Sequence, residues 1–188
     1  MPTYTIFAGV NGAGKTSIYQ SIYYNDNKCE KRINTDEMVA RIGSWQDNNL
    51  QIKCAREAVM LIKSYIKEGI SFNQETTLSG KSIIKNIKLA KNNGFYVVMN
   101  YVGVDSPEIA KYRVRLRVGK GGHGIQEDVI DRRFYDSLKN LNESLSMCDE
   151  VNIYDNTVKF REVIYINKGN LFWKDRNLPM WTNNILIK

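Results

Sequence analysis

The residues that could carry out chemistry begin at Gly9, where the chain reads Gly-Val-Asn-Gly-Ala-Gly-Lys-Thr. Glycines at this spacing let a loop curl so that successive backbone N–H groups point inward and bind phosphate oxygens. In such a loop the lysine reaches the outer phosphates and the threonine hydroxyl holds Mg²⁺. We therefore predict binding of ATP or GTP with Mg²⁺, with Thr16 as the metal ligand and the nucleotide held by Gly9, Asn11, Gly12, Ala13, Gly14, Lys15, Thr16 and Ser17.

The segments on both sides of this loop support the prediction. An apolar run of strand length, Thr3 to Ala8, precedes it, and a helical pattern to about Tyr24 follows. A plain strand-to-helix turn is the alternative interpretation, which the complete set of motif positions and the two flanks disfavour. We also expect Lys15 to be an exposed loop side chain that contributes little packing.

Polar residues lie at or just after the ends of two further predicted strands, residues 31–36 and 70–75. Because ligands gather at the carboxyl ends of strands in an open α/β sheet, these residues are candidate site residues. Asp36 could accept the proton of an acceptor hydroxyl, and its alternative role is the N-cap of a helix beginning at Glu37. We predict that Glu75 and Thr77 contact substrate, the alternative being an ordinary strand end.

A glycine-rich interruption at residues 119–124 separates two predicted helices. Glycines permit movement, and arginines that close over a γ-phosphate would offset the charge that develops during transfer. We therefore predict a lid over about residues 113–133, with charged, solvated helices as the alternative. His123, the single histidine, is expected to order this loop or touch nucleotide rather than act as a base. The arginines near the interruption are Arg113, Arg117, Arg132 and Arg133.

The alternation of strands and helices predicts an α/β fold, a P-loop NTPase-like, doubly wound and mainly parallel sheet in one domain, residues 1–188. A short hairpin at about residues 158–175 should end the sheet, and the tail with Trp181 and residues 185–187 should pack back onto the domain. The other expected strands are residues 95–102 and 151–154. The expected helices are residues 17–24, 48–67, 81–92 with Ser79 as cap, 107–118 and 126–147, and Asn25, Asp26 and Asn27 form a turn.

Bulk composition is that of a globular protein, with 43% hydrophobic and 25% charged residues. We find no apolar stretch long enough to span a bilayer and no signal-peptide pattern, so we expect no membrane partner. Three scattered cysteines, Cys29, Cys54 and Cys148, indicate neither a disulfide framework nor a zinc site. We expect a cytoplasmic protein.

The formal charge of +7 fits nucleic-acid binding or a basic site for phosphorylated substrates. No interleaved basic and aromatic run indicates a nucleic-acid module, so a nucleic-acid partner is disfavoured. A nucleotide switch or nucleic-acid-associated ATPase is a competing function. Such proteins usually have an apolar strand that ends in a magnesium-binding acid, whereas residues 95–102 are followed by Gly103 and Val104 before Asp105.

Taken in order, the motifs resemble the zeta toxin family, and above all its short, stand-alone bacterial members. The likeness covers roughly residues 3–157 and rests on five segments: 9–16, 33–37, 73–80, 117–123 and 154–156. Zeta toxins are P-loop kinases that phosphorylate the 3′-hydroxyl of the amino sugar in UDP-N-acetylglucosamine. The resemblance implies that Asp36 is the base, that Glu75 and Thr77 contact substrate, and that Arg117 with Arg132 or Arg133 surrounds the phosphates.

Two departures concern the acceptor. Larger members often have a basic side chain where this chain has Ser79, and the first acid of their Asp-x-Asp is here Asn34. A nucleotide sugar such as UDP-N-acetylglucosamine is the first expected acceptor, and another metabolite or an antibiotic is the alternative. Since no antitoxin segment precedes the loop, any neutralising antitoxin is expected to be a separate protein.

Overall fold

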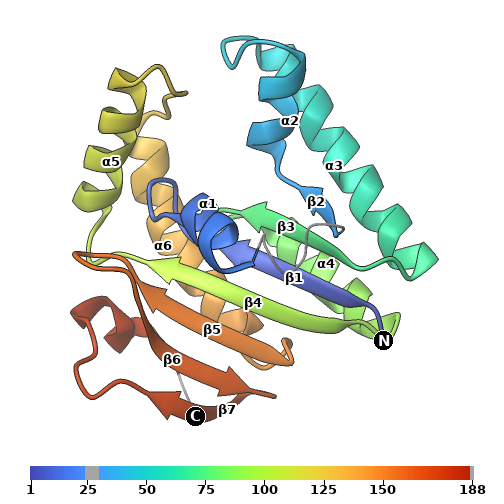
Figure 1. The fold of residues 1–188 in the computed structure, drawn as a ribbon, viewed down its shortest axis with the longest axis vertical. Helices are drawn as coiled ribbons and strands as arrows, with labels where there is room; N and C mark the ends of the chain where they lie inside the picture. The colour runs from blue at the N-terminus through green and yellow to red at the C-terminus, as the bar shows by residue number, and fades with distance from the viewer. Residues whose placement is uncertain (24–29, 187–188) are drawn as a thin grey trace.

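The computed structural model describes residues 1–23 and 30–186 of the chain, and these contain a seven-stranded sheet. The order across the sheet is β2-β3-β1-β4-β5-β6-β7. The first five strands in this order are parallel, and β6 and β7 are antiparallel (Figure 1). This confirms the predicted α/β, doubly wound, mainly parallel sheet and its C-terminal hairpin. The strands are β1 (Thr3–Ala8), β2 (Lys31–Ile33), β3 (Phe72–Thr76), β4 (Tyr96–Gly103), β5 (Glu150–Asp155), β6 (Arg161–Asn167) and β7 (Asn170–Lys174).

The position of β1 decides where ligands can gather. It lies between β3 and β4, so the strand order reverses there, and Ala8 is in register with both Thr76 and Tyr101. The loop that leaves β1 therefore starts beside the residues that leave β3. In open α/β sheets this reversal point, at the carboxyl ends of the strands, opens a crevice for ligands.

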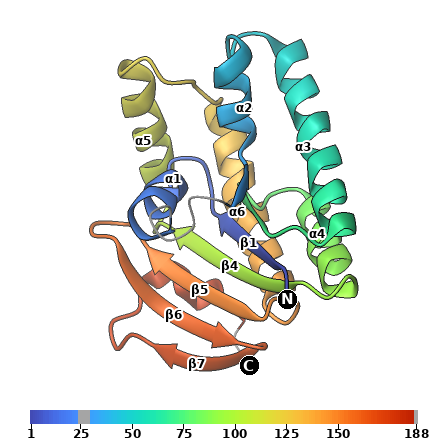
Figure 2. The same cartoon turned by 45° about the vertical axis from the view of Figure 1, so that its right-hand side comes forward.

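The helices surround this edge of the sheet. In Figures 1 and 2, α4 and α6 lie together on one side of the sheet and α1 on the other, while α2 and α3 stand side by side and α5 rises across from them. The helical segments are α1 (Lys15–Ile18), η1 (Tyr19–Tyr23), α2 (Thr35–Ile42), α3 (Asn48–Glu68), α4 (Lys81–Asn92), α5 (Pro107–Gly119), α6 (Glu127–Ser144) and η2 (Met180–Asn184).

The helix after the first loop differs from its prediction. One α-helical turn, Lys15–Ile18, continues as a π-helical segment, Tyr19–Tyr23. The wider π turn accompanies a shared contact, because the rings of Tyr19 and Tyr23 both pack edge-on against Phe7, at centroid distances of 5.4 and 5.1 Å. Tyr24 and the predicted turn at residues 25–27 lie outside the described residues.

Several predicted boundaries were wrong, and the strand expected at residues 70–75, for example, is Phe72–Thr76. The second strand ends at Ile33, because the Asn34 side chain caps α2 and so ends the extended segment. Ser79 does not cap α4, since Gly80 holds the N-cap position without a side-chain bond. The last long helix ends at Ser144, where the serine hydroxyl bonds back to the Asn140 carbonyl at 2.8 Å.

The C-terminal tail packs onto the sheet as predicted for Trp181 and Ile185, both buried. The indole of Trp181 lies against Gly103, where an added Cβ would meet the ring at 2.3 Å, and its N–H donates to Asp155 at 3.0 Å. Leu186 is exposed instead, and Ile187 lies outside the described residues. The tail therefore seals the end of β4.

Among residues 1–23 and 30–186, no helix combines the length and apolarity needed to cross a bilayer. Cys54 and Cys148 are buried free thiols, and Cys29 lies outside the described part of the chain.

Candidate active site

The loop after β1 has backbone angles that favour glycine. Gly9 and Gly12 have φ values of +137° and +82°. A Cβ at Gly9 would lie 2.2 Å from the Val102 carbonyl oxygen, and one at Gly12 would lie 2.5 Å from that of Ala110. Any side chain would therefore strain the backbone and clash with β4 or α5. The glycines let the loop sit tightly between these two elements.

Lys15 is buried, not exposed as the sequence suggested, with 8% of its surface accessible. Its ammonium donates to the Val10 carbonyl at 3.2 Å, inside the curl of the loop. Burial lowers the pKa of Lys15; the nearby carboxylates of Glu75 and Asp36 counteract this, while Arg117 and Arg133 add to it. The protein itself thus holds the lysine in place.

Thr16 and Glu75 form a pair of hard oxygen groups beside this lysine. The Thr16 hydroxyl donates to the Glu75 carboxylate at 3.0 and 3.3 Å. Mg²⁺ is usually held by one or two protein oxygens together with substrate phosphates, so this pair fits the ion. No group of three or more His, Cys, Asp or Glu side chains that could hold a metal occurs among residues 1–23 and 30–186. Glu75 therefore lies beside the hydroxyl that the sequence predicts to be the metal ligand.

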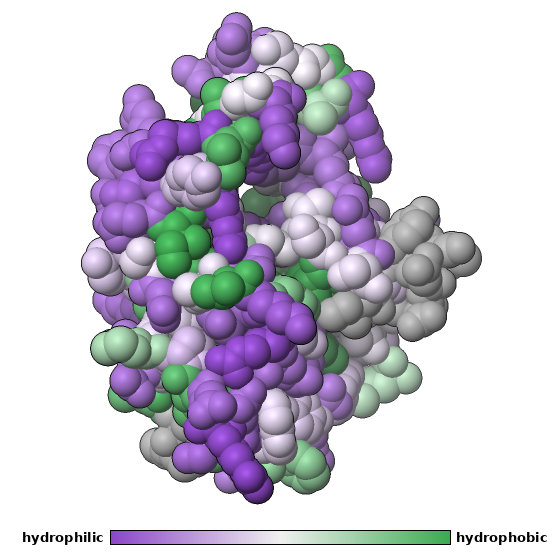
Figure 3. All heavy atoms as spheres, turned by 60° about the vertical axis from the view of Figure 1, so that its left-hand side comes forward, coloured by the Kyte–Doolittle hydropathy of each residue, from purple (hydrophilic) through white to green (hydrophobic). Residues whose placement is uncertain are grey.

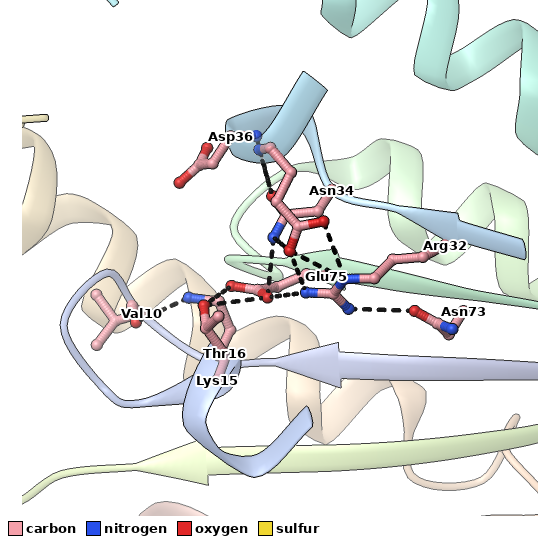
Figure 4. Close-up of polar contacts among 9 residues, drawn as sticks. Val10, Lys15, Thr16, Arg32, Asn34, Asp36, Asn73 and Glu75 are labelled. Carbon is pink, nitrogen blue, oxygen red and sulfur yellow. Dashed lines mark hydrogen bonds and ion pairs between the residues drawn. The ribbon is translucent and has the colours of Figure 1, made fainter. Parts of the chain in front are cut away.

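Arg32 holds Glu75 in position, and sequence reasoning missed this residue. Its guanidinium donates to Glu75 and Glu37, each at 2.8 Å, and Figure 4 shows it beside Glu75. The guanidinium also lies 3.5 Å above the Tyr19 ring. The amide of Asn34 donates to Glu75 at 3.0 Å. The only sequence signal for Arg32 was a cation in a short strand, because Glu75 lies 43 residues away.

Asp36 lies in the first turn of α2, and its carboxylate points away from the Glu75 cluster in Figure 4. The alternative role as N-cap was wrong, because Asn34 accepts the N–H bonds of Asp36 and Glu37. Its Oδ2 lies 3.2 Å from Nε2 of His123. Burial would raise the pKa of the Asp36 carboxyl, but the hydrogen bond and charge of His123, with Lys15 and Arg117, outweigh it and lower that pKa. Asp36 is therefore an ionised carboxylate near neutral pH.

The arginines of the predicted lid have different surroundings. Arg133 donates to the Asn11 side chain at 2.9 Å, which places it at the P-loop, whereas Arg132 is exposed. Arg117 donates to the His123 carbonyl at 3.1 Å. Arg113 donates to the Thr157 carbonyl at 3.2 Å, and its Nη1 is the buried side-chain atom without a hydrogen-bond partner in the described part of the chain. Of the two adjacent candidates, Arg133 is therefore the one that faces the nucleotide loop.

The loop after β3 is held in a strained turn just after Thr77, which was predicted to contact substrate. Leu78 has a φ of +58°, a left-handed angle that is strained for a leucine, and it is fully buried. The side chain of Asn140 donates to its carbonyl at 2.8 Å and holds this turn. The Thr77 hydroxyl bonds that of Ser79 at 2.8 Å. Ser79 thus orients Thr77 instead of capping the next helix.

A cavity of about 640 Å³ joins these groups, and Lys15, Asp36, Glu75, Thr77 and Arg133 all line it. Figure 3 shows an opening on the face that it presents, with both hydrophilic and hydrophobic residues around it. On the α3 and α4 side the cavity is lined by small, apolar or neutral polar side chains. These are Asn48, Gln51, Ala55, Ala58, Val59, Ile62, Ser82 and Asn86. The cavity therefore has a charged end at the P-loop and an uncharged end beyond it.

Comparison with known proteins identifies the family of this chain. Residues 1–170 match the zeta toxin family. An uncharacterized protein of Haemophilus influenzae is 38% identical over 128 residues, which is 68% of this chain and 89% of that protein. The predicted family resemblance is confirmed.

Solved structures share the fold at low sequence identity. One is from the PezAT chromosomal toxin–antitoxin system of Streptococcus pneumoniae, 19% identical, with a TM-score of 0.65 over 83% of this chain and 68% of that chain. Another is the AvrRxo1-ORF1:-ORF2 structure with ATP, 15% identical, with a TM-score of 0.73 over 92% of this chain. This chain spans only 60% of that second chain. Because the family match covers most of its length, the protein belongs to the zeta toxin family and is a P-loop phosphotransferase.

Proposed function

We propose that this protein transfers the γ-phosphoryl group of ATP or GTP, with Mg²⁺, to a hydroxyl of a small acceptor held in the 640 Å³ cavity. The observation that carries the proposal is that Lys15, Asp36 and Arg133 line one cavity although they come from three separate parts of the chain. A phosphate-binding lysine, an ionised carboxylate and an arginine are the groups that phosphoryl transfer requires.

In the proposed reaction, Asp36 is the general base. The acceptor oxygen forms a bond to the γ-phosphorus while the bond from that phosphorus to the β-γ bridging oxygen breaks and the nucleoside diphosphate leaves. The hydroxyl proton passes to the Asp36 carboxylate, whose lowered pKa keeps it ionised and able to accept. Thr16 and Glu75 would hold the magnesium ion that neutralises phosphate charge.

Arg133 and Arg117 are proposed to offset the negative charge of the transferring group. Burial lowers the pKa of each guanidinium, yet an arginine stays charged at physiological pH. Arg133 already lies at Asn11 of the P-loop, and Arg117, near the end of α5, donates to His123 of the glycine-rich segment. A fixed positive charge in a partly dry site stabilises developing negative charge more strongly than water does.

A nucleotide sugar such as UDP-N-acetylglucosamine is the first acceptor that we propose. Family membership supports this choice, and so does a cavity volume within the usual range for small-molecule sites. Side chains that can hydrogen-bond sugar hydroxyls, among them Gln51, Ser82 and Asn86, line the uncharged end. Ser79 supplies no positive charge for the acceptor's phosphates, so we expect a poorer Michaelis constant than in relatives with a basic residue there.

The test is incubation with ATP, Mg²⁺ and a panel of UDP-sugars, with mass spectrometry for one added phosphate on the sugar. Product from an amino-sugar nucleotide supports the proposal. If another metabolite or an antibiotic is phosphorylated and no UDP-sugar is, the proposed kinase activity stands and the proposed acceptor is wrong. If no hydroxylated acceptor is phosphorylated and nucleic acid stimulates nucleotide turnover, the kinase proposal is wrong and the protein is a nucleic-acid-associated ATPase.

We also propose that a separate antitoxin neutralises this protein. Its support is the family and the toxin–antitoxin system named for a structural neighbour. Co-purification of the untagged product of a neighbouring open reading frame, with loss of phosphotransfer in the complex, is the expected result. Full activity in such a complex would contradict neutralisation.

A further inference from the structure

His123 connects three segments that are far apart in the sequence. Its ring stacks on Trp45, in the loop between α2 and α3, at a centroid distance of 4.1 Å and an interplanar angle of 15°. Nε2 lies 3.2 Å from Oδ2 of Asp36 on α2 and 3.2 Å from Nη2 of Arg117 on α5. Only 12% of the His123 side-chain surface is exposed. The imidazole is thus held by stacking while one nitrogen faces two groups of opposite charge.

The two neighbours of Nε2 require it to play opposite hydrogen-bonding roles. A carboxylate only accepts, so Asp36 is satisfied when Nε2 carries a proton. A guanidinium only donates, so Arg117 is satisfied when Nε2 presents its lone pair. One nitrogen cannot do both at once. The tautomer or charge of His123 therefore decides which of the two residues it binds.

We propose that His123 is a positioning residue that couples docking of Arg117 on the nucleotide to the orientation of the Asp36 carboxylate. The proposal rests on the phosphotransfer function proposed above. When Arg117 turns to the phosphates, its hydrogen bond to the Nε2 lone pair breaks. The Nε2–H form then donates to Oδ2 of Asp36 and leaves Oδ1 to receive the acceptor proton. The Asp36 carboxylate is thus oriented when nucleotide is bound.

The surrounding residues suit such an exchange of partners. The stack on Trp45 fixes the plane of the imidazole, so Nε2 keeps facing Asp36 after Arg117 leaves. Arg117 also holds the His123 carbonyl at 3.1 Å, and its side chain passes so close to Gly122 that a Cβ there would lie 2.6 Å from Arg117 Cγ. Lys15 is the further cation that acts on Asp36 from the P-loop side. The glycine thus lets the arginine and histidine share one tight turn.

The first test reads the imidazole itself. Because the chain has one histidine, long-range ¹H–¹⁵N spectra of the protein without a histidine tag report its tautomer without overlap. We expect the Nε2–H form to increase when Mg²⁺ and a non-hydrolysable ATP analogue are added, and this increase to be absent in Asp36→Asn. An identical nucleotide response in wild type and Asp36→Asn would overturn the proposal.

The second test is kinetic. In His123→Ala we expect kcat to fall about 10- to 100-fold, the range found for side chains that orient ligating groups, with the nucleotide KM changed less than about twofold. The acid limb of the kcat profile should move to higher pH, because Asp36 loses a partner that lowers its pKa. His123→Gln, whose amide can donate to Asp36 without titrating, should recover most of kcat.

Equal losses in the alanine and glutamine variants with an unmoved acid limb would show a merely structural loop residue and overturn the proposal. Trp45→Ala should reproduce part of the His123→Ala effect, and Trp173→Ala, a half-exposed tryptophan on the edge strand, is the matched control. The spectra need no turnover, so they separate the two proposals. Absence of phosphotransfer in the wild-type protein would refute the proposed function. An active kinase in which the His123 tautomer responds to nucleotide in the same way in wild type and in Asp36→Asn would refute only the role of His123.

Discussion

Asn34 shows how one side chain organises the site. Its amide oxygen accepts the N–H groups that begin α2, and its amide nitrogen donates to Glu75 at 3.0 Å and Glu37 at 3.1 Å. An aspartate could cap the helix equally well, but it could not donate, and it would add a third carboxylate beside the other two. The asparagine thus permits the Glu37–Arg32–Glu75 cluster, which gives a physical reason for this departure from the family's acid.

Asp36→Asn should keep nucleotide affinity and lose transfer. An amide is nearly the same size as the carboxylate but cannot take a proton, so we expect kcat to fall about 10²- to 10⁴-fold. Transfer from γ-labelled ATP and nucleotide titration by calorimetry measure the two properties. Asp128→Asn, an exposed acid on α6, is the control. Lost affinity with an unchanged kcat would make Asp36 a nucleotide-binding or metal-binding residue instead.

Lys15→Met should lose transfer without losing the fold. Because Lys15 is buried, methionine keeps the packing of the stem and removes only the charge, which burial already disfavours. Removal of one electrostatic donor costs about 3–4 kcal/mol of transition-state stabilisation, or roughly 10²- to 10³-fold in kcat. Thermal melts should show a normal Tm that ATP and Mg²⁺ raise far less than in wild type or in Lys85→Met, an exposed-lysine control. Wild-type turnover in Lys15→Met would refute the nucleotide site.

At the scale of elements, the site lies between two helices that begin on opposite sides of β1. Asp36, the proposed base, is on α2, which follows β2, and Arg117 is near the end of α5, which follows β4. The glycine-rich turn after α5 brings His123 back to α2, so it bridges the two halves. A few backbone angles in this turn can change the distance between Arg117 and Asp36.

We expect residues 119–133 to exchange amide hydrogens more slowly once nucleotide and Mg²⁺ are bound. Arginines that dock on phosphates would tie this segment to the P-loop and reduce local opening. Hydrogen-exchange mass spectrometry of wild type and Lys15→Met, each with saturating nucleotide, makes the comparison, and β7 is the internal reference. Unchanged exchange in wild type would indicate a static helical hairpin in place of a lid.

At the scale of the whole molecule, the antiparallel end of the sheet and the tail complete the core. Trp181 is buried, lies against Gly103 and donates to Asp155, which in turn accepts from Thr157 at 2.6 Å. Thr157 also accepts the Asp105 N–H at 3.0 Å and its carbonyl binds Arg113. The tail is thereby connected to the start of α5 through a chain of hydrogen bonds.

Trp181→Ala should destabilise the protein by about 3–5 kcal/mol, the usual cost of removing a fully buried large aromatic side chain. Urea unfolding followed by circular dichroism measures the change. Trp173→Ala, with 45% of the tryptophan exposed, should cost much less. Similar losses in both variants would mean that the tail does not pack onto β4 in solution.

The local sequence determined most of the fold and the identity of the nucleotide loop. The Gly-x-x-x-x-Gly-Lys-Thr pattern needs only neighbouring residues, because φ values above zero and inward N–H groups are properties of one short segment. The bounds of helices α3 and α4 were predicted to within a residue, since hydrophobic periodicity and helix-ending residues act over a few positions, although the Ser79 cap of α4 was wrong. The predictions that Asp36, Glu75 and Thr77 meet near the loop followed from strand ends sharing one edge of the sheet.

Only the tertiary structure decided which side chains meet. Lys15 is buried in a loop whose Gly9 and Gly12 pack against β4 and α5, and neither element is near the loop in sequence. Arg133 reaches Asn11 across 122 positions, while its neighbour Arg132, identical in type, faces outward. Arg32, Trp45 and His123 gave no strong signal of their own, because each depends on a partner from another element. Local sequence patterns specify the shape of the backbone, whereas a contact between side chains needs two distant segments to pack together. The hydrogen bonds and charge interactions of this site therefore appear only in the folded chain.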